Sequence, residues 1–185
     1  MRYRERVWTP SAPASLAVSV EEFKAHARIT FAESDDQIED IFLPAAISYV
    51  EKETQRLLTA REAVLRLPTL PDGFCDVELP GGEVSAVESV VADGVTIDGS
   101  AYEVVGDSPA RILALEAWPA VTGRGLPVTI TYTAGFAEAP AELKVAVCMI
   151  AAENYRRRTE ADIEGAQRVP LGAAHYIGKW RIRAL

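Results

Sequence analysis

The stretch Val128-Thr-Ile-Thr-Tyr-Thr-Ala-Gly135 alternates apolar and polar residues and stops at a glycine, which predicts a half-buried β-strand. Soon after it, Pro140 stands at a first-turn position with Glu142 close behind, so we expect a helix over 140–158. Apolar residues go right round this helix, which predicts burial on more than one side. The change from a two-residue to a helical period is typical of an α+β protein.

Short strands separated by turn residues fill the chain upstream of that stretch. Asp93-Gly94 is a strong two-residue hairpin signal between two β-branched runs. With the strand at 128–133 they predict an antiparallel β portion over 61–133. The other expected strands lie at 64–67, 75–79, 84–91, 95–97, 102–105 and 111–115.

Two helices are expected before the β portion. Ser19-x-x-Glu22 is a capping box that opens a helix over 19–28, and Ser34-x-x-Gln37 is a second one that opens a helix over 34–58. Pro44 lies inside the second helix, so we expect a kink there or two abutting helices. The expected apolar stripe of this helix is Ile38, Ile41, Phe42, Ala45 and Tyr49.

The remaining segments complete an expected organisation around one domain over 16–158. Residues 1–15 are rich in proline and lack an apolar period, which predicts an extended arm. Residues 159–170 are polar and read as a linker, and residues 171–185 form an apolar and basic tail.

The charge is distributed unevenly along a chain of ordinary globular composition, with 185 residues, 49% apolar and 25% charged. The net charge is −8, whereas residues 1–10 carry +2 and residues 156–185 carry +4, so the body between them carries −14. An acidic body is a poor nonspecific DNA binder. Basic ends of this kind often mark interaction tails.

Several classes of protein are disfavoured by what the sequence does not contain. No apolar run reaches the length of a membrane span, and the prolines at 10 and 13 interrupt any signal-peptide core. Cys75 and Cys148 read as two small buried hydrophobes rather than a disulfide framework, which fits a reducing compartment.

Motifs of catalysis and of cofactor binding are also missing. The sequence has no phosphate-binding glycine loop, no nucleophile elbow and no zinc-protease motif, and His26 and His175 stand far apart. We therefore expect no enzyme activity, no cofactor and no metal site. The acidic residues Asp35, Asp36, Glu39 and Asp40 read as a first helical turn rather than as a cation cluster.

The order of these elements resembles the head–tail connector (adaptor) proteins of long-tailed bacteriophages and of phage-derived particles such as gene transfer agents. The resemblance spans residues 16–158 and continues more loosely toward the C-terminus. The segments that carry it, in order, are Ser19-Val-Glu-Glu-Phe-Lys-Ala-His-Ala-Arg28, Asp35-Asp-Gln-Ile-Glu39, Ala45-Ala-Ile-Ser-Tyr-Val-Glu51, Val77-Glu-Leu-Pro-Gly-Gly-Glu-Val84, Val87-Glu-Ser-Val90, Tyr102, Trp118-Pro119, Val128-Thr-Ile-Thr-Tyr-Thr-Ala-Gly-Phe136 and Pro140-Ala-Glu-Leu-Lys144.

This resemblance implies a small helical bundle with an inserted antiparallel β-sheet portion. It implies a structural virion protein that forms a ring, expected to be twelve-fold, below the portal protein of the capsid. Such a ring extends the DNA channel and is the platform for the stopper or tail, in a neck assembled in the host cytoplasm. An acidic channel wall would let DNA pass without sequence-specific binding.

The resemblance points to the C-terminal tail as the element that docks on the portal, because the C-terminal region does so in related adaptors. Aromatic and arginine residues are also frequent interface hot spots. The alternative is that the tail packs on its own domain. The expected docking residues are Tyr176, Ile177, Lys179, Trp180, Arg181, Ile182 and Arg183.

Two further groups of arginines are candidates for contact with DNA or a neighbouring subunit. Arg2, Arg4 and Arg6 lie in the arm, where a disordered terminus is the alternative. Arg156, Arg157 and Arg158 end the long helix, where a solvated helix end is equally consistent.

Rival functions are a stopper or tail-completion protein of the same neck, a nucleic-acid-binding module that uses the basic ends, and an enzyme. If the chain is a nucleic-acid-binding module, we expect steeply salt-dependent DNA binding. If it is a connector, we expect the free protein to have little DNA affinity.

Overall fold

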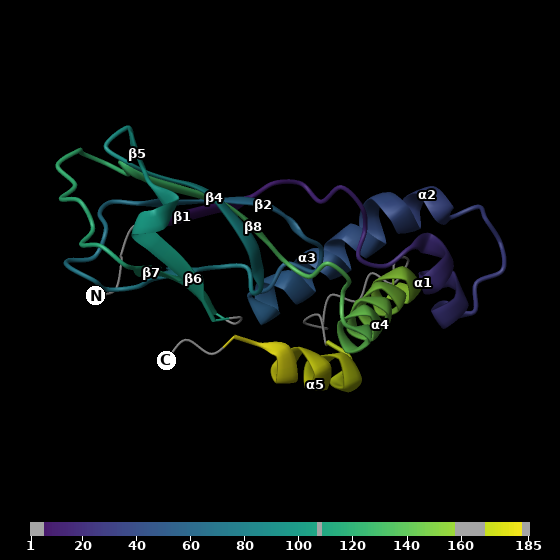
Figure 1. Ribbon diagram of the computed structural model, residues 1–185. Helices are drawn as coiled ribbons and strands as arrows, with labels where there is room; N and C mark the ends of the chain where they lie inside the picture. The colour runs from purple at the N-terminus through teal and green to yellow at the C-terminus, as the bar shows by residue number, and fades with distance from the viewer. Residues whose placement is uncertain (1–5, 107–108, 158–168, 183–185) are drawn as a thin grey trace. The chain divides into compact units, whose positions relative to one another are not determined.

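The computed structural model describes residues 6–106, 109–157 and 169–182, and the chain divides into two compact units. The β unit comprises residues 1–14 and 60–136, and the helical unit comprises residues 15–59 and 137–185 (Figure 1). Helices and antiparallel sheets thus occupy separate parts of the chain, which confirms the mixed α and β class expected from the sequence.

The β unit contains a five-stranded antiparallel sheet whose central strand is the alternating stretch at 128–134. Its apolar residues Val128, Ile130 and Tyr132 are buried, while the threonines between them are only half-buried. The strand order is β1 (Val7–Pro10), β2 (Arg61–Leu67), β8 (Val128–Ala134), β4 (Val84–Ala92) and β5 (Val95–Ile97).

A three-stranded antiparallel sheet supplies the rest of this core. Ile112 and Leu79 are fully buried in it, and the hydroxyl of Tyr132 donates a 2.9 Å hydrogen bond to the carbonyl of Pro80. Burial raises the pKa of Tyr132 far above its usual value, so this donor keeps its proton. The strand order is β3 (Val77–Leu79), β7 (Ala110–Ala114) and β6 (Tyr102–Val105), with a short 3₁₀ turn, η2 (Gly99–Ala101), before β6.

The hairpin between β4 and β5 turns at Asp93-Gly94, as predicted. Both residues have positive φ, 50° and 79°, which is the requirement of a type I′ turn. The Asp93 carboxylate also accepts hydrogen bonds from the backbone N–H groups of Thr122 and Gly123, at 2.8 and 3.0 Å. These bonds hold the pKa of Asp93 below its usual value and fix the 121–127 loop to the hairpin.

The N-terminal segment takes part in the larger sheet. Val7–Pro10 forms strand β1 and pairs with β2 in antiparallel register. No strand was predicted there, because the run is short and ends at Pro10, which cannot donate a backbone hydrogen bond. The segment is extended over the described residues.

The helical unit is organised around α4 (Ala141–Arg157). This helix contacts α1 (Val20–Ala27), α3 (Leu43–Thr54) and α5 (Leu171–Trp180), as the apolar residues around its circumference predicted (Figure 1). Its fully buried positions are Leu143, Ala146, Val147 and Ala151. The Ser19 capping box of α1 is present in both directions, and Arg28 ends the helix in the left-handed conformation.

The prediction of a second capping box at Ser34 is wrong. No side-chain cap forms at Ser34; instead its buried hydroxyl accepts a 3.2 Å hydrogen bond from Tyr155 of α4. The segment is also not one helix, because it comprises α2 (Asp35–Gln37), a π-helical turn η1 (Ile38–Phe42) and α3, with Pro44 in the first turn of α3. The interruption expected at Pro44 is thereby confirmed.

The π turn explains why the expected apolar stripe fails beyond Ile38. The backbone N–H of Leu43 bonds to the carbonyl of Ile38, five residues back, so one extra residue is inserted in the helical path. The buried face is therefore displaced by one position, and Ile41 is 58% exposed. The residues that are buried are Ile38, Leu43, Ala46, Ile47, Val50 and Thr54.

The two cysteines differ in environment, and both are free thiols. Cys148 is buried in α4 as expected, whereas the prediction of a buried Cys75 is wrong. Cys75 is exposed because strand β3 begins only at Val77, which leaves Cys75 in the preceding loop.

Candidate interaction surface of the helical unit

The C-terminal residues 171–180 form helix α5, which packs on α4 and α3 of its own unit. Ala173 and Ile177 are the buried residues of this helix. The site of a Cβ at Gly172 lies 2.8 Å from the Met149 methyl group, so the first turn of α5 also approaches α4 closely. The alternative of a tail that packs on its own domain is thus realised for these residues.

Trp180 is held by two residues from other segments, Glu142 and Arg56. Its indole N–H donates to the carboxylate of Glu142 in α4, and Lys179 pairs with the other oxygen of Glu142 at 2.6 Å. The Arg56 guanidinium lies 5.7 Å from the centre of the Trp180 ring, and Arg56 Nε donates to the Trp180 carbonyl at 2.7 Å. The bonds from Lys179 and Trp180 hold the pKa of Glu142 below its usual value.

The residues after α5 follow the end of α3. The backbone N–H of Ile182 donates to the Thr54 carbonyl at 3.0 Å, and Arg181 lies 3.5 Å from the Glu53 carboxylate. The last turn of α5 and its C-terminal extension are therefore fixed by polar bonds, whereas its middle is fixed by apolar burial.

The predicted docking residues differ in their exposure. Ile177 is 6% exposed because it packs inside the helical unit, and Trp180 is half-buried. Lys179 and Arg181 are exposed, while Tyr176 and Ile182 are half-buried and Arg183 lies outside the described residues. The outer face of α5 also presents Leu171, Ala174, His175 and Gly178, which the sequence interpretation did not include.

The predicted arginine groups are only partly described. Arg6 is exposed ahead of β1 in the β unit, and Arg2, Arg4 and Arg158 lie outside the described residues. Arg156 and Arg157 both pair with the Glu153 carboxylate on their own helix. Two guanidinium groups thus share one carboxylate, which leaves the C-terminal end of α4 positively charged.

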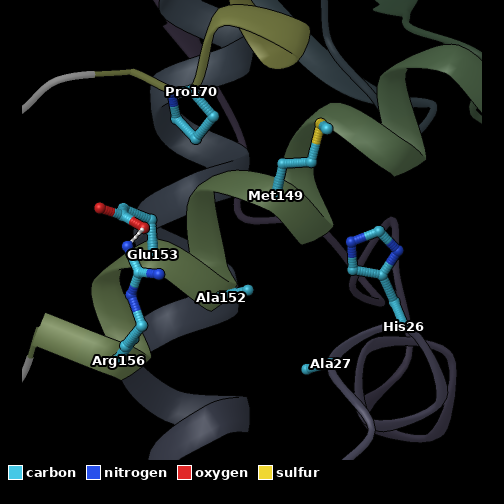
Figure 2. Close-up of a pocket in the computed structure, with 7 residues that line it drawn as sticks. All are labelled: His26, Ala27, Met149, Ala152, Glu153, Arg156 and Pro170. Carbon is cyan, nitrogen blue, oxygen red and sulfur yellow. Dashed lines mark hydrogen bonds and ion pairs between the residues drawn. The ribbon is translucent and has the colours of Figure 1, made fainter.

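An open pocket of about 470 Å³ lies on the helical unit between the end of α1 and α4. Figure 2 shows His26 and Ala27 on one side of it, with Met149, Glu153 and Arg156 coming from α4. Ala152 and Pro170 complete the lining. Apolar side chains thus line it together with the polar groups of His26, Glu153 and Arg156. No motif links these positions, so the sequence alone did not point to them.

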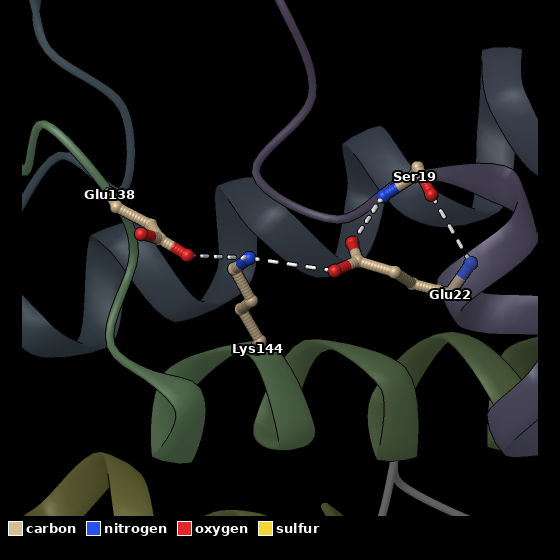
Figure 3. Close-up of polar contacts among 4 residues, drawn as sticks. All are labelled: Ser19, Glu22, Glu138 and Lys144. Carbon is tan, nitrogen blue, oxygen red and sulfur yellow. Dashed lines mark hydrogen bonds and ion pairs between the residues drawn. The ribbon is translucent and has the colours of Figure 1, made fainter.

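Lys144 forms a second polar cluster on the same unit. Figure 3 shows its ammonium group between Glu138 and Glu22, at 3.6 and 3.5 Å. The Ser19 backbone N–H and Lys144 hold the pKa of Glu22 below its usual value. The cluster joins the α1 capping box to α4 and is structural in character.

The thiol of Cys148 is buried in α4. Burial raises the pKa of Cys148 to about 11, so this thiol stays protonated near neutral pH. Across residues 6–106, 109–157 and 169–182, no group of three or more His, Cys, Asp or Glu residues is placed to hold a metal ion. Within the same ranges, no helix is long and apolar enough to cross a membrane.

Solved structures of gene transfer agent particles resemble this chain over nearly its whole length. A chain from the neck of an empty particle, computed with C6 symmetry, has a TM-score of 0.80 and 28% identity, with 97% of each chain covered. A chain of the native virion has a TM-score of 0.78 and 29% identity, with 96% of each chain covered. A chain from the native neck, computed with C12 symmetry, has a TM-score of 0.74 and 27% identity, covering 96% of this chain and 97% of that chain.

No protein-family model and no curated protein matches the sequence. The particle chains are similar to this chain in both fold and sequence, and the similarity covers both units. It confirms the resemblance to phage-derived particle proteins that the order of the sequence segments predicted.

Proposed function

We propose that this chain is a structural protein of the neck of a gene-transfer-agent-like particle, and specifically the head–tail adaptor that forms a ring below the portal. The observation that carries the proposal is the match, over 97% of both chains, to a chain from such a neck.

A ring of identical subunits is supported by the symmetry of the similar assemblies. Their necks were computed with C6 and with C12 symmetry. A twelve-fold ring satisfies both, because a twelve-fold axis contains a six-fold axis. Rings of this kind are built from a head-to-tail contact repeated around the axis.

The surface charge of the β unit fits a channel through which DNA passes. The described residues of this unit include ten Asp or Glu and five Arg. Phosphate binding grows with each Lys or Arg that neutralises a phosphate, so an acidic wall does not retain DNA. We therefore propose passage of DNA without sequence-specific binding.

Helix α5 is the proposed contact to the portal. Its buried side fixes it to α4 and α3, and its outer side offers Ala174, Gly178 and Lys179 to a partner. A helix held in place before binding loses little conformational freedom on docking. The second candidate, a stopper or tail-completion protein, rests on the same likeness, because the similar chains come from the neck as a whole.

The portal contact is tested by co-sedimentation with the purified portal of the same particle. A chain lacking residues 171–185 is expected to lose binding, and Ala174→Asp/Gly178→Asp to weaken it at least tenfold. Ala174 is exposed and a Cβ at Gly178 meets nothing within 4 Å, so neither substitution creates a steric clash. Ser48→Asp, on the exposed side of α3, is the matched control and is expected to bind normally.

Normal binding by both the truncated chain and the double variant would contradict docking through α5. Binding to an assembled adaptor ring but not to the portal would support the stopper instead.

A further inference from the structure

The loop before β3 carries an apolar side chain in an unusual setting. Phe74 lies in the segment Pro71-Asp72-Gly73-Phe74-Cys75-Asp76 and is 63% exposed. The loop itself is fixed, because the Trp118 backbone N–H donates to the Gly73 carbonyl at 3.2 Å and the Trp118 indole donates to the Cys75 carbonyl at 2.8 Å.

Trp118 is itself fixed, so Phe74 is held outward. Trp118 is 8% exposed and stacks on Tyr102 with ring centres 6.3 Å apart. The carbonyls on both sides of Phe74 are thus bonded to one buried residue. An aromatic ring presented by a fixed loop loses little freedom when a partner covers it, which favours an interaction role.

Carboxylates flank this ring. Asp72 and Asp76 are both exposed, and Asp76 forms a 2.9 Å ion pair with Arg111. The loop therefore presents an apolar tip beside the carboxylate of Asp72, whereas that of Asp76 is paired with Arg111.

The pocket of the helical unit has the opposite character. Its apolar lining is Ala27, Met149 and Ala152, and its polar lining includes His26, Glu153 and Arg156. Arg156 and Arg157 share the single carboxylate of Glu153, so this end of α4 carries net positive charge. Its volume of about 470 Å³ lies within the range that holds whole small ligands, so one aromatic ring fits. A cation in the lining is also favourable beside an aromatic face.

We propose that the Phe74 loop of one subunit inserts into the His26–Arg156 pocket of the next subunit in the ring. The two surfaces are different and complementary in charge and polarity, as a head-to-tail contact requires. This inference rests on the proposed ring, and it adds the identity of one subunit contact. In this contact Asp72 faces the positively charged end of α4, and the Phe74 ring covers Met149.

The apolar part is tested by Phe74→Ala, with ring assembly measured by mass photometry, alone and on the purified portal. We expect the concentration needed for half assembly to rise at least tenfold. Val95→Ala removes another exposed apolar side chain of the β unit, at 69% exposure, and is expected to assemble as the native chain does. Unchanged assembly of Phe74→Ala would overturn the contact.

The charged part of the contact is tested by reversing the charges of Asp72 and Arg156. Asp72→Arg and Arg156→Glu are each expected to weaken assembly, and the chain with both changes is expected to recover most of it. Glu62→Arg is the control, because Glu62 is an exposed carboxylate on strand β2 of the same unit. A double variant no better than the weaker single variant would contradict direct pairing.

The exposed thiol beside Phe74 gives a direct geometric test. In assembled Ala27→Cys, oxidation is expected to join Cys75 to the new thiol of the next subunit and give a ladder of covalent oligomers. Cys75→Ser should abolish the ladder, and Ser48→Cys should not form it. Cys148 is buried and stays protonated, so it does not compete.

A disulfide within one chain, or rings with no ladder, would overturn the proposed contact while leaving the neck function intact. A native chain that forms no ring, alone or on the portal, would overturn the proposed function and the contact together.

Discussion

The Trp180 indole donates a hydrogen bond to the Glu142 carboxylate and so joins the last turn of α5 to the first turn of α4. Lys179 binds the other oxygen of the same carboxylate. Glu142 thus fixes the C-terminal end of α5 together with Arg56 and the Thr54 carbonyl, whereas Ala173 and Ile177 hold the helix by apolar burial.

The Glu142 contact makes the end of α5 sensitive to acid. The lowered pKa of Glu142 means that its stabilisation is complete above the usual value of 4.5 and is lost as the pH falls through the lowered value. We expect the Trp180 indole N–H resonance to move in that acidic range. In Glu142→Gln this movement should be absent, and an identical titration there would contradict the role of Glu142.

The middle of α5 is predicted to depend on Ile177. Ile177→Ala should weaken the docking of the helix by about 2–5 kcal/mol, the usual range for truncation of a buried aliphatic side chain. Hydrogen exchange of the α5 amides measures this loss, and His175→Ala, at an exposed position of the same helix, is the control. Equal exchange in both variants would show that the helix is held chiefly by its polar end.

The π turn leads to a prediction about a deletion. Removing the exposed Ile41 deletes the extra residue, so the buried positions of α3 stay aligned with Ile38 in a continuous α-helix. Pro44 would then stand inside a regular helix, which costs about 3 kcal/mol. We expect the deletion with Pro44→Ala to fold with near-native stability and the deletion alone to be less stable by about that amount.

Denaturant unfolding of the two deletion variants gives this difference. If the deletion with Pro44→Ala unfolds far more easily than the native chain, the prediction is wrong. The π turn would then do more than shift the buried face of α3 by one residue.

The Asp93 clamp predicts that Gly123 tolerates no larger residue. A Cβ at this position would lie 2.4 Å from an Asp93 carboxylate oxygen and 2.8 Å from the Pro127 Cβ, so Gly123→Ala must break the clamp or displace the loop. We expect a loss of about 1–3 kcal/mol on unfolding. Gly99→Ala meets nothing within 4 Å and should be nearly neutral, and equal effects of the two would contradict the clamp.

The acidic body predicts weak DNA binding by the free protein. Fluorescence anisotropy with a labelled duplex should show little binding at physiological salt and no steep dependence on salt concentration. Tight binding with a steep salt slope would favour the nucleic-acid-binding module, through the basic ends.

The sequence predicted the elements whose pattern is local. The alternation in β8, the Asp-Gly hairpin and the Ser19 capping box each depend on neighbouring residues, and all three are present. The failures arose where tertiary contacts decide. Ser34 bonds to Tyr155 from a distant helix, and the π turn displaced the α3 stripe by one residue.

The interaction surface was predictable only in part. The tail residues were identified from their composition and a resemblance, but Glu142 and Arg56, which hold Trp180, carried no signal. The Phe74 loop and the His26 pocket are likewise produced by long-range packing, since Trp118 fixes the loop from a distant segment and α1 reaches α4 only in the folded unit.

Electron cryomicroscopy of the protein mixed with the purified portal of the same particle is the decisive measurement for the adaptor ring. We expect a ring of twelve subunits seated on the portal, with α5 at the contact and an open central channel. A protein that stays monomeric and leaves the portal unoccupied would contradict this expectation.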